Sequence, residues 1–152
     1  MTSTPSLNSA PAANKTRNRV MTATAIDLLE ATRTHLCQFE VPHPWSVTIN
    51  TSLSGRAINV QLDCLEPPEV AAALLAWADT LTAVTAEAWR TPNGDSVHLS
   101  VTGHLANSAL LRVFAAIPYT DHGLGADLDP GAEATLRLSA LRQLATPGQV
   151  SA

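Results

Sequence analysis

The residues best suited to chemistry lie on one face of a hairpin that the sequence predicts pair by pair. Residues 85–90 alternate small apolar side chains with larger polar ones, and residues 96–105 alternate again. Asn93-Gly94 lies between the two runs. Asn-Gly between alternating runs is the strongest short-range hairpin signal, because both turn positions need a positive φ. With these two residues as the loop, the register of both strands is fixed.

In this register Ala88 lies opposite Leu99 on an apolar face, and Trp89 lies opposite His98 on a polar face. A three-residue loop over 106–108 would bring side chains of the next strand onto the polar face. A two-residue loop would turn those side chains to the other face. The candidate binding residues on the polar face are Glu87, Trp89, His98, His104, Arg112 and Phe114.

Aromatic side chains beside arginine and histidine on a sheet surface suit the binding of a partner peptide, a planar ligand or stacked bases. Glu87 and His98 could also act as a general base and its orienting partner. The simpler interpretation of these two is a solvated polar face. In a further alternative, a C-terminal helix covers the face, and Trp89 and Phe114 belong to the core.

Signals for catalysis and metal binding are weak. The chain lacks the G-x-S-x-G and Walker motifs, and no G-x-G-x-x-G follows a predicted strand. His98 and His104 are about 20 Å apart along one strand, too far to share a metal ion. His104 could form a composite site with Asp121 and His122 if the loop that carries them folds back. The spacing of His35, Cys37 and His43 with Cys64 matches no known zinc pattern. We therefore predict no catalytic residue, metal or cofactor, with an acid–base histidine (His98, His104 or His122) as the enzymatic alternative.

Composition favours a binding protein. Of the 152 residues, 45% are hydrophobic and 14% charged, and the charged share is well under the roughly 25% of ordinary domains. Such a surface is poorly protected against association, so we expect a protein partner or a homodimer. The net charge of −4 disfavours a broad grip on duplex phosphates. A short basic cluster at Lys15, Arg17 and Arg19 leaves single-stranded nucleic-acid binding as a further alternative.

The cysteines and the N-terminus bear on the compartment. Cys37 and Cys64 have no C-x-x-C spacing, which favours two buried structural thiols over a disulfide. Residues 1–14 lack the apolar run of a signal peptide, and no stretch approaches the ~18 apolar residues of a membrane span. We expect a cytoplasmic protein. One lysine against eight arginines is typical of a GC-rich genome such as that of an actinobacterium.

The elements that must position these residues follow from periodicity. Residues 1–17 predict a disordered N-terminal arm, 18–118 an α+β domain, and 119–152 a loop, a possible helix over 132–145 and a tail. Helical patterns cover 20–39 and 67–83, the second with Trp77 on its apolar stripe. A first hairpin alternates over 45–53 and 58–64, and a Ser54-Gly55 loop would pair Ile49 with Val60.

The predicted order is α-β-β-α-β-β-β, with a possible final helix. Hairpin connections and one-sided alternation indicate an α+β two-layer sandwich, with a mostly antiparallel sheet of about five strands and helices on one face. We expect a small non-enzymatic binding or regulatory accessory protein that acts through the open sheet face.

Overall fold

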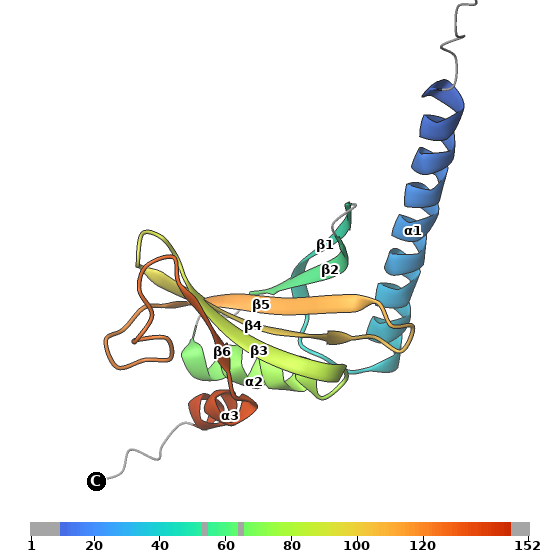
Figure 1. The fold of residues 1–152 in the computed structure, drawn as a ribbon. Helices are drawn as coiled ribbons and strands as arrows, with labels where there is room; N and C mark the ends of the chain where they lie inside the picture. The colour runs from blue at the N-terminus through green and yellow to red at the C-terminus, as the bar shows by residue number, and fades with distance from the viewer. Residues whose placement is uncertain (1–9, 53–54, 64–65, 147–152) are drawn as a thin grey trace, which may run out of the picture.

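The computed structural model describes residues 10–52, 55–63 and 66–146 (Figure 1). It is an α+β fold with one open sheet, as the sequence predicts. The elements are α1 (Ala10–Gln38), β1 (Pro44–Ser52), β2 (Gly55–Leu62), α2 (Pro67–Ala78), β3 (Thr82–Arg90), β4 (Ser96–His104), β5 (Leu110–Pro118), β6 (Glu133–Leu136) and α3 (Leu138–Ala145).

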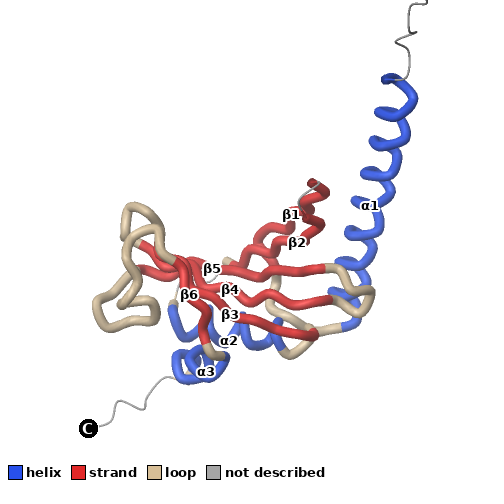
Figure 2. Tube along the Cα trace, in the orientation of Figure 1, coloured by secondary structure: helices blue, strands red, loops and turns tan. Residues whose placement is uncertain are grey.

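The strands lie in the order β1-β2-β5-β4-β3-β6 (Figure 2). All neighbours are antiparallel except β2 and β5, which run parallel. In the chain, α2 and the β3–β4 hairpin lie between β2 and β5. In the sheet, β5 lies directly beside β2, so this pair is connected by a crossover instead of a hairpin. The mostly antiparallel sheet is confirmed.

The sixth strand was not expected. Residues 132–145 were predicted to form one helix, whereas β6 occupies Glu133–Leu136 and α3 begins only at Leu138. β6 pairs with the free edge of β3, with Ala88 opposite Ala134. Hydrogen bonds to an available sheet edge outweigh the small differences in helix propensity over so short a segment.

The β3–β4 hairpin has the predicted register, with Ala88 opposite Leu99 and Trp89 opposite His98. Its turn is wider than expected, because Thr91 N–H donates to Ser96 O and the loop spans residues 92–95. Within this loop only Gly94 has a positive φ, of 79°. The wider loop has the same centre as the two-residue loop, so the strand pairing is unchanged.

The predicted register of the first hairpin is wrong by two residues. Ile49 lies opposite Ile58, and Ser52 opposite Gly55. A shift of two residues keeps every side chain on the same face, so alternation alone cannot choose between the two registers. Trp45 lies at a β-bulge between Pro44 and Ser46 and is 69% exposed, although the pattern placed it facing inward.

The core lies between the sheet and α2. Trp77 is fully buried, as are Val60 and Val101, and Ile49 packs partly buried against this cluster. This confirms the predicted orientation of α2. α3 packs against α2, and its Leu141 is fully buried. Figure 1 shows both helices on the same side of the strands.

α1 begins at Ala10, earlier than the predicted Val20, and much of it extends away from the sheet (Figure 1). Disorder at the N-terminus stays a prediction, because residues 1–9 lie outside the described part. Cys37 is exposed on α1, so the prediction of a buried thiol is wrong there, and Cys64 lies outside the described residues. None of the helices in the described part is long and apolar enough to cross a membrane.

Candidate functional site

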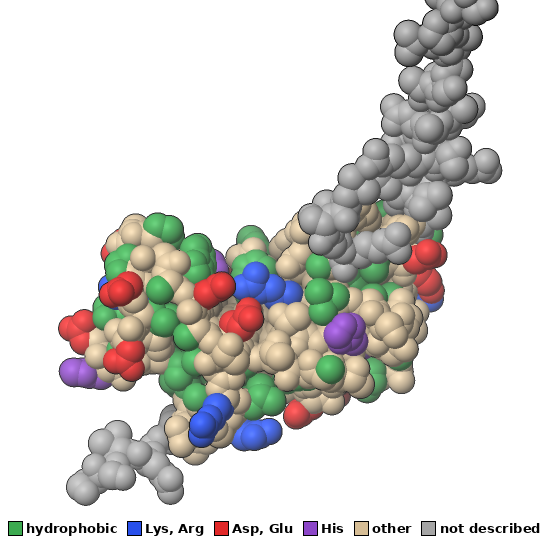
Figure 3. Space-filling model, viewed as in Figure 1, with side chains coloured by type: hydrophobic (Ala, Val, Ile, Leu, Met, Phe, Trp, Pro, Cys, Tyr) green, Lys and Arg blue, Asp and Glu red, His purple; other side chains and the backbone are tan. Residues whose placement is uncertain are grey.

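The open face of the sheet is the face opposite α2. Because α3 packs against α2, it does not cover this face, so the alternative in which a C-terminal helix buries Trp89 and Phe114 is wrong. Both side chains are half-buried. Figure 3 shows basic and acidic side chains close together near the middle of the visible side. The candidate surface is therefore not covered by α3.

The β4–β5 register places the third strand as predicted. Thr102 lies opposite Arg112, and Ser100 lies opposite Phe114. Leu105 N–H donates to Ala109 O across the three-residue loop. Arg112 and Phe114 consequently share the open face with Trp89 and His98.

Three rings on this face, those of Trp89, His98 and Phe114, lie across three strands with His98 in contact with each of the other two; we call them the aromatic row. The Trp89 and His98 ring centroids are 5.1 Å apart in an edge-to-face arrangement. His98 stacks on Phe114 at 6.2 Å with an interplanar angle of 13°. Contacts of this kind contribute about 0.5–1.5 kcal/mol beyond the area they bury. The rings therefore hold one another in place on a rigid sheet.

Arg112 lies at the end of the aromatic row. Its Cζ is 6.0 Å from the centre of the Phe114 ring, at the outer limit of a cation–π contact. Its Nη2 donates to Ser100 Oγ over a long 3.4 Å, and its buried Nε donates to no acceptor within the described residues. The guanidinium has most of its donors unused.

The environment of His98 disfavours its charged form. Burial lowers the pKa of the imidazole, and the nearby positive charge of Arg112 lowers it further. A neutral imidazole has one donor and one acceptor nitrogen. At neutral pH, His98 can therefore stack and hydrogen-bond without adding charge to the surface.

The other candidate residues are not part of the aromatic row. Glu87 is half-buried on β3 between Ser100 and Thr135 of the neighbouring strands. In the described part of the chain it makes no hydrogen bond to His98, so the structure does not assemble the base and orienter. His104 lies at the far end of β4, and His122 is exposed in the loop after β5.

A hollow of about 300 Å³ beside Arg112 was not anticipated from the sequence. It lies where β1 and β2 join β5 on the open face, and its walls contain no acidic residue. It is lined by Ser46, Thr48, Asn50, Asn59, Gln61, Arg112 and Phe114. The polar alternation of the first hairpin was visible in the sequence, but the parallel pairing that joins it to β5 has no local signal.

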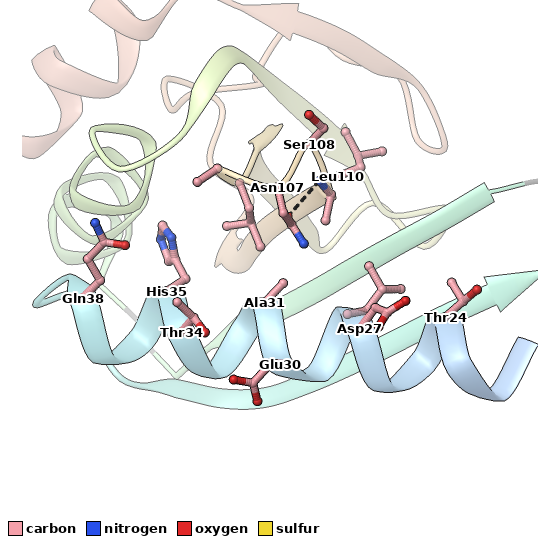
Figure 4. Close-up of a pocket in the computed structure, with 14 residues that line it drawn as sticks. Thr24, Asp27, Glu30, Ala31, Thr34, His35, Gln38, Asn107, Ser108 and Leu110 are labelled. Atoms are coloured by element: carbon pink, nitrogen blue, oxygen red, sulfur yellow. Dashed lines mark hydrogen bonds between the residues drawn. The ribbon is translucent and has the colours of Figure 1, made fainter.

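A larger groove, of about 730 Å³, runs between α1 and the β4–β5 loop. Figure 4 shows His35 and Ala31 of α1 facing Asn107 and Leu110 across it. His35 is 5% exposed and stacks on Trp77 with ring centroids 5.8 Å apart.

The hydrogen bonds of His35 fix its tautomer. Thr80 Oγ1 donates its single proton to Trp77 O at 2.7 Å, so it accepts a proton from His35 Nε2 at 2.9 Å. Burial lowers the pKa of this histidine. His35 therefore anchors α1 to α2 as a neutral imidazole.

No group of three or more metal-ligating side chains comes together in residues 10–52, 55–63 and 66–146. The fold and site define an α+β sandwich with one open, aromatic-bearing sheet face. No family model, curated protein or solved structure matches the chain.

Proposed function

We propose that this protein is a non-enzymatic binding protein, with an accessory or regulatory role, that recognises a protein partner through the open face of its sheet. The observation that carries this proposal is the position of α3. The helix packs against α2, so it leaves the aromatic row and Arg112 half-buried at the surface instead of in the core.

The chemistry of the row supports binding. Tryptophan and arginine are enriched among the residues that dominate binding energy, and they act best in partly desolvated positions. The side chains come from β3, β4 and β5, whose backbones are fixed by the ladder on both sides. Little conformational freedom is lost when a partner docks on such a surface.

The test compares two tryptophans in partner capture. The immobilised wild type, Trp89→Ala and Trp45→Ala are each used to retain proteins from a lysate of the source cells, and retained proteins are identified by mass spectrometry. Trp45 is a matched control, because it is 69% exposed on β1, four strands from β3. We expect Trp89→Ala to lose the partner and Trp45→Ala to keep it.

Thermal melts of the same variants exclude misfolding. Trp89→Ala should cost less than the about 3–5 kcal/mol of a fully buried aromatic, because the side chain is half-buried. Equal retention of the partner by Trp89→Ala and wild type would refute the proposal. A second copy of the chain as the retained protein would identify the partner as a homodimer subunit.

A further inference from the structure

The hollow beside Arg112 has the organisation of a site for a small anionic group. Its walls are two rows of residues that cross the sheet. Thr48, Asn59 and Arg112 lie opposite one another in the first row, and Ser46, Gln61 and Phe114 in the second. The two strands of the first hairpin and the distant β5 thus contribute polar side chains to one hollow.

The charge of the hollow is that of Arg112 alone. The other lining side chains are neutral amides, hydroxyls and one ring. Among the described residues, the only ion pair joins Arg33 to Glu30 on α1, far from this site. The nearest carboxylate on the open face in the strand register is Glu87, on β3. β3 is two strands from β5, and no carboxylate of the described residues forms an ion pair with Arg112.

The hydrogen-bonding capacity of the hollow is also unused. Arg112 donates only the long bond from Nη2 to Ser100 Oγ among the described residues, so its terminal nitrogens have donors left for a ligand. The side chains of Asn50, Asn59 and Gln61 make no hydrogen bond to other described residues. A set of convergent donors and acceptors with one fixed cation is what orients a polar ligand group.

We infer that this hollow binds a carboxylate, held by the guanidinium of Arg112 and flanked by the amides of Asn59 and Gln61. Arginine and a carboxylate match in shape and can share two parallel hydrogen bonds. One guanidinium balances one monoanion. The volume of about 300 Å³ is at the low end for small-molecule sites, so it admits a group of amino-acid size.

The source of the carboxylate is either a free small acid or the partner of the open face, and only the second source rests on the proposed function. A partner would insert a C-terminal carboxylate or an acidic side chain here. The adjacent aromatic row would contact the rest of the segment.

Carboxylate binding is measured by NMR titration of the ¹⁵N-labelled full chain at constant ionic strength. The probe is N-acetylglycine, and N-acetylglycinamide is its neutral analogue. We expect saturable shifts of the Asn59 and Gln61 side-chain amides and of Arg112 Nε–H with the acid alone. Arg112→Gln should weaken binding at least about tenfold, and Arg112→Lys less, because lysine keeps the charge but not the planar fork.

Arg142→Gln is the control, because Arg142 is exposed on α3 at the opposite layer. It should bind like the wild type, and the spectra report whether each variant is folded. Equal shifts with the acid and the neutral amide, undiminished binding by a folded Arg112→Gln, or no saturable shift with the acid would each overturn the inference.

Two further probes separate the sources. One is a peptide with a free C-terminal carboxylate, and the other is the same peptide amidated and carrying an internal glutamate. Tighter binding of either peptide than of N-acetylglycine indicates a partner segment, and equal binding indicates a free acid. If no carboxylate binds while Trp89→Ala still loses its partner, the inference fails and the proposed function stands. If N-acetylglycine binds while Trp89→Ala keeps its partner, the proposed function fails, and the inference that the hollow binds a carboxylate is supported.

Discussion

At the scale of single residues, two neutral histidines make the free energy of unfolding depend on pH. Burial lowers the pKa of His35 and of His98, and Arg112 adds to the effect at His98. Just below the ordinary histidine pKa of 6.5, the unfolded chain therefore holds more protons than the native state. The stabilisation is complete above that pH and is lost as the pH falls through the folded-state pKa values.

We expect the free energy of unfolding, measured in urea, to be lower at pH ~5 than at pH ~7.5. His35→Gln should reduce that difference, because glutamine keeps an amide donor for Thr80 and does not titrate. His43→Gln serves as the control, since His43 is exposed before β1. An acid loss that is the same in His35→Gln as in the wild type would show that His35 does not contribute to it.

The candidate site could be predicted from the sequence only where its pairs are local. The Trp89–His98 pair follows from one turn, and Arg112 and Phe114 follow from one three-residue loop. Asn59 and Gln61 could not be placed, because their neighbours Arg112 and Phe114 are about 50 residues away along the chain and pair in parallel. Unused hydrogen-bonding groups are likewise a property of the packed structure and not of the residue types.

At the scale of elements, local patterns were reliable where a turn and an apolar stripe agreed. The stripe through Trp77 predicted the buried side of α2. The helical pattern over residues 132–145 gave a wrong prediction, because β6 pairs with the free edge of β3, and no local pattern reveals that edge. The first hairpin shows the remaining ambiguity, since its alternation permits two registers that bury the same side chains.

α3 supplies the element-scale prediction. Leu141 is the fully buried residue of this eight-residue helix. Leu141→Ala should therefore lower the free energy of unfolding by about 2–5 kcal/mol, as large-to-small changes in cores do. The matched control Leu138→Ala, at a half-buried position of the same helix, should cost less. Urea unfolding measures both, and a loss under about 1 kcal/mol for Leu141→Ala would contradict the packing of α3 on α2.

Because α3 packs on α2 and β6 pairs with β3, a C-terminal truncation would not test the open face alone. Removal of residues 131–152 deletes β6 and α3 together. The truncated chain would lose stability through the α2 layer and the β3 edge, even with the open face intact. Only substitutions confined to that face, such as Trp89→Ala, separate binding from folding.

At the scale of the whole molecule, stability is expected to fall from the sheet centre to its edges. β4 and β5 have a hydrogen-bonded strand on both sides and α2 packed beneath them. β6 is a four-residue edge strand with three exposed residues, and β1 is the other edge. Amides in such edges exchange through local opening, whereas central amides require larger or global unfolding.

Hydrogen–deuterium exchange followed by mass spectrometry tests this gradient. We expect β4 and β5 to be protected longest and β6 to exchange first among the strands. His98, Arg112 and Phe114 would then lie on the most rigid backbone in the protein, which gives a binding surface its geometry before a partner arrives. Trp89 would lie on β3, whose outer side depends on β6. Exchange of β4 and β5 as fast as that of β6 would contradict a preorganised face and would favour a surface that orders on binding.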